Sequence, residues 1–252
     1  MFSTHQPFVK IGIPFIHLSE IDSTNNYALD LIKKQKAVSG TVVFAEKQTK
    51  GKGQRGKQWH SKAYENIILS IILDVSKILI QKQFILNAFA AVACYDFFKK
   101  YAGNSTAIKW PNDLYFNDKK AGGVLIETIN HQNKRYAIIG IGINVNQKIF
   151  DSSIPNPTSL SIITENEFII PELSKELLIH LNHWLPSLFE NEKHILHAYN
   201  QYLYKKNQPI VLKKGSIRFN CIVEAVNDYG ELIISNALQT SVQHGEVEWI
   251  IP

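Results

Sequence analysis

The segment Gly40–Ser61, GTVVFAEKQTKGKGQRGKQWHS, is the most informative part of this 252-residue chain for its fold and function. It begins as an apolar strand, Thr41–Ala45, and continues into a glycine-rich loop that ends at Trp59. The loop carries four cations, Lys50, Lys52, Arg55 and Lys57, and no acid lies between Glu46 and Glu65. Because glycine loses much entropy when it is ordered, we expect a polyanion such as a nucleoside triphosphate to fix the loop. For an isolated segment of this kind, a solvated basic surface loop is the alternative.

The composition indicates a folded protein with a sizeable core, since 45% of the residues are apolar and 19% are charged. This length fits one large domain, alone or with a small appendage. The net charge of +5 favours an anionic partner, but phosphate ligands, acidic proteins and nucleic acids all satisfy it. Cys94 and Cys221 lack metal-ligand spacing and are expected to be buried, reduced thiols. The N-terminal MFSTHQPFVK and the interrupted apolar runs predict neither a signal peptide nor a membrane span, which favours a cytoplasmic protein.

Hydrophobic periodicity predicts an α+β fold, in which helices flank a mixed or antiparallel sheet. Antiparallel hairpins are the simplest arrangement for residues 107–145, because polar turns separate their apolar runs. The expected strands are Phe8–Leu18, Thr41–Ala45, Asn66–Asp74, Thr106–Trp110, Leu114–Phe116, Val124–Ile129 and Tyr136–Val145. The expected helices are Tyr27–Lys36, Gln83–Tyr101 and Pro171–Tyr204, the last with a break near Pro186.

The pattern changes near residues 205–208. Short strands separated by turns are expected from there on, at Pro209–Lys213, Arg218–Val226, Glu231–Ser235 and Glu246–Ile250. Strands of this number and length predict a small β-barrel of SH3-like size. We therefore expect a main domain over residues 1–205 and a C-terminal SH3-like β domain over residues 206–252.

Polar clusters occur at helix starts or strand ends. They are Ser23-Thr24-Asn25, the Gln48–Trp59 loop, Lys109–Asp113 with Lys120, and Gly140–Asn144. No nucleophile–base arrangement accompanies them, and the loop lacks the spacing of a P-loop. A set rich in cations, glycine and amides but poor in general bases suits nucleotidyl transfer, in which the enzyme positions groups and neutralises charge on phosphate.

Together these segments resemble the biotin–protein ligases, also called biotin–acetyl-CoA-carboxylase ligases. The motifs that carry the resemblance are Asp22-Ser23-Thr24-Asn25, the basic loop ending in Trp59, Lys109-Trp110-Pro111-Asn112-Asp113, Lys120–Glu127 (KAGGVLIE) and Gly140–Asn146 (GIGINVN). They follow the family order over about 125 residues and precede a β-rich tail. The combination is therefore much more specific than any single motif.

The resemblance implies that residues 1–205 form a class II synthetase-like catalytic domain that binds biotin and ATP. In the implied reaction, biotin and ATP, with Mg²⁺ assisting, give biotinyl-5′-AMP and pyrophosphate. The biotinyl group then passes to one lysine of a biotin carboxyl carrier protein or domain, from acetyl-CoA carboxylase or a related carboxylase, and AMP is released.

The same resemblance assigns roles to matching positions. Lys120 would reach the biotin carboxylate and the α-phosphate, and Asp113 would organise the groups around it, with Mg²⁺ near Asp113 and no firm metal ligand. The positions implied for biotin are Ser23, Thr24, Asn25, Gln48, Lys52, Gly53, Gln54, Lys120 and Gly123. The positions implied for ATP or the adenylate are Arg55, Lys57, Trp59, Lys109, Asn112, Gly142 and Asn144. Purely structural roles remain open for Lys120 as a hairpin lysine, Asp113 as a turn residue and Trp59 as a core anchor.

The chain departs from the family pattern in two places. Gln54 stands where the family loop, Gly-Arg-Gly-Arg, has its second arginine, so a neutral amide replaces a bidentate cation. We expect looser retention of biotinyl-AMP unless Arg55 compensates. About 20 residues precede Asp22, fewer than a winged-helix DNA-binding domain needs, and we therefore expect the monofunctional form.

Other functions fit the sequence less well. A lipoate or octanoate–protein ligase shares the catalytic core, but the loop and the Lys109–Asp113 motif favour the biotin branch. A nucleic-acid-binding module would need a basic, aromatic-studded face, whereas these cations are concentrated in one loop. A non-catalytic homologue is disfavoured by the presence of Lys120 and the loop. The resemblance is also compatible with a homodimer through the central sheet, using strand edges around Ala137–Val145.

Overall fold

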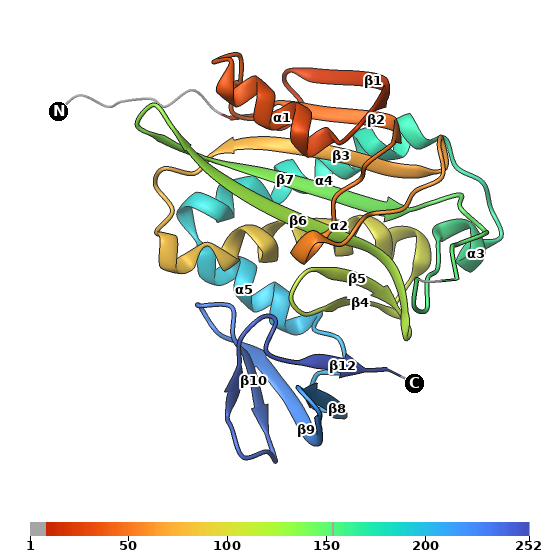
Figure 1. Ribbon diagram of the computed structural model, residues 1–252, viewed down its shortest axis with the longest axis vertical. Coiled ribbons are helices and arrows are strands. Elements are labelled where there is room, and N and C mark those ends of the chain that lie inside the picture. Colours follow the sequence, from red (N-terminus) through yellow and green to blue (C-terminus); the bar gives the residue numbers. More distant parts are fainter. Residues whose placement is uncertain (1–8, 153, 252) are drawn as a thin grey trace.

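The computed structural model describes residues 9–251 apart from residue 153. Its main sheet has seven strands in the order β1-β2-β3-β7-β6-β5-β4 (Figure 1). Their bounds are β1 (Phe15–Ile21), β2 (Val42–Gln48), β3 (Asn66–Asp74), β4 (Thr106–Lys109), β5 (Asp113–Phe116), β6 (Lys119–His131) and β7 (Lys134–Asn144). β1 and β2 pair in parallel and the other neighbours pair antiparallel. The expected mixed sheet and the antiparallel hairpins of residues 107–145 are confirmed.

The sequence of β3, NIILSIILD, explains why this strand lies at the centre of the sheet. Neighbouring side chains of a strand point to opposite faces. Leu69 and Ile71 enter the large hydrophobic core, whereas Ile72 packs in a smaller cluster with Ala28 and Ile32. Both faces of β3 are therefore buried, and its β-branched residues suit that position.

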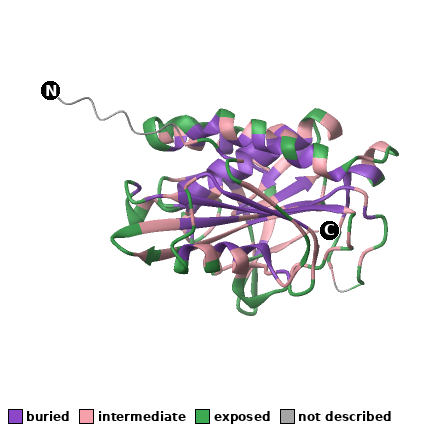
Figure 2. Ribbon diagram, turned by 90° about the horizontal axis from the view of Figure 1, so that it is seen from above, coloured by how far each residue is buried: buried purple, intermediate pink, exposed green. Residues whose placement is uncertain are grey.

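Helices cover both faces of the sheet. Those that the structure describes are α1 (Thr24–Lys33), α2 (Phe84–Ala102), α3 (Leu160–Thr164), α4 (Ile170–Glu190) and α5 (Glu192–Gln201). α2 and α4 lie behind the sheet in Figure 1, while α1 packs on its front. Seen from above, the buried strands form a layer beneath helices whose outer residues are exposed (Figure 2).

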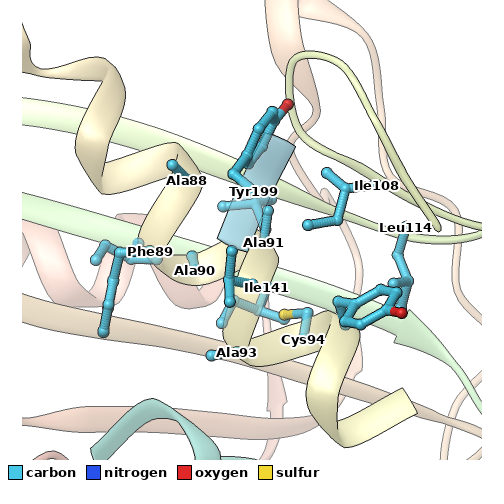
Figure 3. Packing of buried hydrophobic residues seen from close by; sticks show 14 of the residues in the cluster. Ala88, Phe89, Ala90, Ala91, Ala93, Cys94, Ile108, Leu114, Ile141 and Tyr199 are labelled. Carbon is cyan, nitrogen blue, oxygen red and sulfur yellow. The ribbon is translucent and has the colours of Figure 1, made fainter. Parts of the chain in front are cut away.

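Small side chains let α2 approach the sheet closely. Ala88, Ala91 and Cys94 lie in the same cluster as Leu114 and Ile141 of the strands (Figure 3). Both cysteines are buried and free, as expected, and burial raises the pKa of the Cys94 thiol to about 12. None of the helices described here combines the length and the apolar character that crossing a membrane requires.

The expected helix break near Pro186 is wrong. α4 continues through Pro186 and ends at Glu190, and the chain breaks instead at Asn191. Asn191 has torsion angles that are not helical (φ −149°, ψ 67°), and its side chain accepts a hydrogen bond from the His194 N–H at the start of α5. An asparagine that caps a new helix is a stronger local stop than a proline whose helix is held by tertiary packing.

The expected first strand and the expected sheet edge also need correction. β1 begins at Phe15 rather than at Phe8, which lies outside the described residues. β7 is an interior strand between β3 and β6, so the expected edges around Ala137–Val145 are wrong. The sheet ends at β1 and β4, and β6 adds an open edge from Leu125 to His131, where it pairs only with β7 among the described residues.

A second, five-stranded antiparallel sheet follows α5, in the order β11-β10-β9-β8-β12. Its strands are β8 (Pro209–Lys214), β9 (Ile217–Val226), β10 (Leu232–Ser235), β11 (Ser241–Val242) and β12 (Glu248–Ile250). The Asn200 side chain of α5 exchanges two hydrogen bonds with the Val226 backbone, at 2.9 and 2.6 Å. The Trp110 indole N–H donates to the Gly230 carbonyl at 2.9 Å. This sheet, the expected small all-β module, is therefore fastened to the main one.

Candidate functional site

The α1 face of the main sheet carries a row of directly paired residues from five strands. Ile68 of β3 pairs with Gly142 of β7, and Gly142 pairs with Gly123 of β6. Gly123 pairs with Asp113 of β5, which pairs with Lys109 of β4. Residues opposite one another in a ladder share a face. The two glycines at the centre of this row have no side chains, so side chains from elsewhere can lie directly against the sheet there.

Lys120 reaches this row because of a β-bulge. The β5–β6 register shifts between Leu114 and Tyr115, so that Tyr115 pairs with Lys120 and Leu114 with Gly122. Lys120 and Gly123 would lie on opposite faces of a regular strand, and the extra residue puts both on the face of Asp113. The Lys120 ammonium then lies 2.6 Å from Asp113 Oδ1.

Gly123 makes room for this ion pair. A Cβ atom at this position would lie 3.1 Å from Asp113 Oδ1 and 3.6 Å from Lys120 Nζ. The lysine side chain is 29% exposed and the aspartate 18%, so the pair is partly shielded from water without being sealed. A cation held in this way on an open, glycine-lined surface is available to an anionic ligand.

A second polar group, which we call the headgroup cluster, consists of Thr24, Asn25, Gln48 and Ser70. The Thr24 N–H donates to Gln48 Oε1 at 2.7 Å. The Ser70 hydroxyl lies 2.7 Å from the Thr24 hydroxyl and 2.5 Å from Asn25 Oδ1. Gly140 lies beneath Asn25, and a Cβ there would be 2.4 Å from Asn25 Oδ1. The start of α1 is therefore held on the sheet by a hydrogen-bonded polar network.

The separation between the headgroup cluster and Lys120 follows from the ladder. Gly140, beneath Asn25, lies two residues along β7 from Gly142, which pairs with Gly123 beneath the Lys120 ammonium. Two residues along a strand span about 7 Å, and one strand across spans about 4.8 Å, giving a diagonal of about 8 Å. The headgroup cluster and the Lys120 ammonium therefore lie close together on one face of the sheet, with the Trp59 ring on Gly142 between them.

The glycine-rich loop crosses this surface as a small hairpin. Lys52 and Gln58 form an antiparallel bridge, and the Gly53 N–H donates to the Lys57 carbonyl at 2.7 Å. The turn at its tip, η1 (Gln54–Gly56), holds Arg55 in the left-handed region at φ 56°. At its base, the Trp59 ring lies against Gly142, where a Cβ would be 2.6 Å from the ring.

The hairpin touches two other parts of the molecule. The Lys52 ammonium lies 3.3 Å from Glu127 Oε1 on β6. The Arg55 guanidinium donates to the Gly245 carbonyl of the C-terminal sheet at 3.3 Å. Gln54 lines a cavity of about 530 Å³ that lies between the open edge of β6 and the C-terminal turn at His244.

Lys109 lies in an aromatic setting at the end of the row. Its ammonium is 5.3 Å from the centre of the Tyr115 ring and 5.4 Å from the Trp249 ring. Burial lowers the pKa of Lys109, and the nearby Asp113 carboxylate partly opposes this effect. A cation stabilised mainly by rings and one carboxylate gains from any further negative charge on the sheet surface.

The structure brings together most of the residues that the sequence singles out. Those on or over the glycine-lined surface are Thr24, Asn25, Gln48, Lys52, Trp59, Lys109, Asp113, Lys120, Gly123 and Gly142. Ser23 is buried at the α1 N-terminus without a side-chain cap bond, and Lys57 is exposed on the hairpin. The Asn112 side-chain amide donates to the Val124 carbonyl, and the Asn144 side-chain amide donates to the Thr158 carbonyl. Both side chains therefore link backbone segments to each other.

Sequence reasoning misses four residues of this region. Ser70 lies within an apolar strand, and only its position in the ladder opposite Gly140 reveals its role. Glu127 ends the KAGGVLIE motif, and its signal in the sequence is that it is the lone acid on the strand that carries Lys120. His244 and Trp249 come from the C-terminal sheet, and no local pattern connects them with the main domain.

Comparison with known proteins agrees with this geometry. Residues 18–144 match the model of the biotin/lipoate A/B protein ligase family. The chain is 42% identical over 142 residues to the bifunctional ligase/repressor BirA of Bacillus spizizenii, an alignment that covers 56% of this chain and 43% of that protein. It is 28% identical over 226 residues to the biotin--[acetyl-CoA-carboxylase] ligase of Paracoccus denitrificans, covering 86% and 92% of the two chains.

Solved structures show the same fold. The biotin protein ligase of Aquifex aeolicus, in complex with biotin and ATP, superposes with a TM-score of 0.79 at 25% identity. That match covers 94% of this chain and 99% of the other. The similarity therefore extends beyond the matched segment into the C-terminal sheet, although the chain spans less than half of the BirA protein.

Proposed function

Since the chain belongs to the biotin/lipoate A/B protein ligase family, we propose that it activates biotin with ATP and transfers it to a lysine of a carrier protein. The observation that carries this proposal is the placement of the Lys120–Asp113 ion pair about 8 Å along the open surface from the headgroup cluster. Biotin has a polar ureido ring at one end and a carboxylate at the end of a short alkyl chain. Its two ends match the two polar groups of the surface.

In the first step, a biotin carboxylate oxygen attacks the α-phosphorus of ATP, and the bond to pyrophosphate breaks. The reacting groups are both anions, so their approach needs a cation between them. Lys120 supplies it: its ammonium is held at 2.6 Å by Asp113 and projects over Gly123. Asp113 orients the lysine, and Lys109 adds positive charge at the end of the row.

In the second step, the ε-amine of the acceptor lysine attacks the acyl carbon of biotinyl-5′-AMP, and AMP leaves. The proposed acceptor is a biotin carboxyl carrier protein or domain of acetyl-CoA carboxylase or a related carboxylase. The open edge of β6 beside the site offers room for the carrier, or for a second copy of the chain in a homodimer. ATP and a carboxylase subunit are substrates found in the cytoplasm, where we place the reaction.

Mg²⁺ enters this proposal as part of the MgATP substrate. Among the described residues, no group of three or more His, Cys, Asp or Glu side chains is arranged to hold a metal ion. Asp113, the carboxylate of the row, is already paired with Lys120. Mg²⁺ often keeps several waters and binds through substrate phosphates with one or two carboxylates, which is compatible with these residues.

The direct test supplies the purified chain with MgATP and either biotin or lipoate, and measures pyrophosphate release. We expect release with biotin and little with lipoate or octanoate. Release with lipoate or octanoate alone would assign the chain to the lipoate branch of the family. Release with neither acid would overturn the proposed activation step.

The loop amide at Gln54 gives a further prediction. Gln54→Arg should slow the escape of biotinyl-AMP by about three- to ten-fold, because a bidentate, charge-assisted contact to phosphate is worth about 1 kcal/mol more than a neutral one. Dissociation of pre-formed adenylate, measured by rapid filtration, gives the rate. The exposed Gln58→Arg change on the same hairpin is the matched control for added charge. Equal release rates from the wild type and Gln54→Arg would show that this position does not retain the adenylate.

A further inference from the structure

Glu127 connects two elements that would contact the ligand from different sides. Its Oε2 accepts a hydrogen bond from Asn25 Nδ2 at 2.7 Å, and its Oε1 lies 3.3 Å from Lys52 Nζ. Asn25 belongs to α1 and Lys52 to the glycine-rich hairpin. The carboxylate projects from β6 on the site face of the sheet, two strand positions from Leu125 and four from Gly123. It is therefore a bridge between the headgroup cluster and the loop.

The bridge also fixes the direction of the hydrogen bonds in the headgroup cluster. An ionised carboxylate only accepts, so the Asn25 amide must turn its NH₂ group toward Glu127 and its oxygen toward Ser70. The Ser70 hydroxyl donates toward Asn25 Oδ1 at 2.5 Å and the Thr24 hydroxyl at 2.7 Å, and the Thr24 hydroxyl itself donates to Gln48 Oε1 at 3.1 Å. The acid therefore fixes the orientation of the Asn25 amide, which presents its oxygen to Ser70.

The same acid restrains the hairpin. Lys52 lies at the base of the hairpin, and its side chain is 36% exposed when paired with Glu127. The hairpin tip is held separately, through Arg55 and the Gly245 carbonyl. The Lys52–Glu127 ion pair therefore joins the hairpin base to β6.

We propose that Glu127 is a positioning residue that couples the glycine-rich loop to the biotin headgroup cluster, holding the loop base through Lys52 and orienting Asn25 for the ligand. In this proposal Glu127 contacts neither the biotin carboxylate nor the α-phosphate. It acts through the side chains of Asn25 and Lys52. The proposal has two halves. The ligand half, that Glu127 orients Asn25 for biotin, rests on the proposed function. The loop half, that Glu127 holds the loop base through Lys52, concerns the protein without ligand.

The loop half is tested by trypsin cleavage of the unliganded protein, because Lys50, Lys52, Arg55 and Lys57 are all cleavage sites in one short segment. Glu127→Gln should increase the rate of cleavage in this segment about five-fold, because the partly exposed Lys52–Glu127 ion pair then no longer opposes local opening of the hairpin. Glu20→Gln, which breaks the 2.8 Å Lys47–Glu20 pair on the neighbouring strands, is the matched control and should leave the rate unchanged. The reversed pair, Glu127→Lys with Lys52→Glu, should restore protection of Lys50, Arg55 and Lys57, the sites of the segment that remain in this variant. Unchanged cleavage in Glu127→Gln would overturn the loop half.

The ligand half is tested by a double-mutant cycle on the KM for biotin. Glu127→Ala should raise this KM about five- to ten-fold with little change in kcat, since it disorders the binding end and leaves Lys120 in place. In an Asn25→Ala background the same change should have no further effect, because Glu127 acts through Asn25. Independent, additive effects on KM would overturn this half, as would a loss confined to kcat. Failure of the wild type to bind biotin would instead overturn the proposed function, and the trypsin comparison would still stand.

Discussion

Lys120→Ala is expected to slow the formation of biotinyl-5′-AMP by about 10²–10³-fold, the range seen when one charge-stabilising donor is removed from an active site. The Lys120 ammonium is held 2.6 Å from Asp113 over the glycine-lined surface, where the biotin carboxylate and the α-phosphate would meet. Without it, two anions approach one another with no cation between them. Biotin-dependent pyrophosphate release under single-turnover conditions measures this step.

The neighbouring lysine supplies the control for this variant. Lys119 is exposed and lies on the same strand, so Lys119→Ala removes an equal charge and should change the rate less than two-fold. A Lys120→Ala protein with wild-type rates of pyrophosphate release would contradict the catalytic role and leave Lys120 as an ordinary strand residue.

Gly140→Ala should have the second largest effect, a loss of both stability and biotin binding, because there is no space for the added methyl group. A Cβ at Gly140 would lie 2.4 Å from Asn25 Oδ1, and Asn25 is held in place by Ser70 at 2.5 Å and by Glu127 at 2.7 Å. Overpacking of this kind costs about 1–3 kcal/mol of unfolding free energy. Displacement of Asn25 should also weaken biotin binding about ten-fold or more, the equivalent of about 1.4 kcal/mol. Urea denaturation and titration calorimetry measure the two effects.

A second variant separates the clash from general damage to the sheet. Adding Asn25→Ala to Gly140→Ala removes the clashing side chain, so the double variant should recover most of the lost stability while biotin binding stays weak. If Gly140→Ala alone unfolds at the wild-type urea concentration and binds biotin normally, then Asn25 is not seated on Gly140 as described.

Local sequence patterns predict those parts of the fold that local forces determine. The apolar run of β3 is expected at Asn66–Asp74 and is found there, because a run in which eight of nine residues are buried suits a strand covered on both faces. The polar turns between residues 107 and 145 predict the hairpins. Pro186 misleads because the helix around it buries Leu181, Trp184, Leu185 and Leu188, and this packing outweighs the local cost of a proline.

Long-range pairing accounts for what local patterns do not show. Nothing within β7 indicates that it lies between β3 and β6, and the expectation of an exposed edge there fails for that reason. The bulge that turns Lys120 toward Asp113 depends on the register of two strands. Ser70, Glu127 and Gly140 acquire their roles only when α1 is docked on the sheet. The resemblance to known ligases points to the residues that we propose to contact the ligand, and the structure adds the residues that hold these side chains in place.

The most direct test of the account is the complete transfer reaction. The purified chain is incubated with biotin, MgATP and a biotin carboxyl carrier domain, and the carrier is analysed by intact mass and peptide mapping. We predict that the carrier gains one biotinyl group on its acceptor lysine, and that a carrier with arginine at that position gains none. A carrier whose mass is unchanged after incubation with the folded wild-type chain would contradict the central claim.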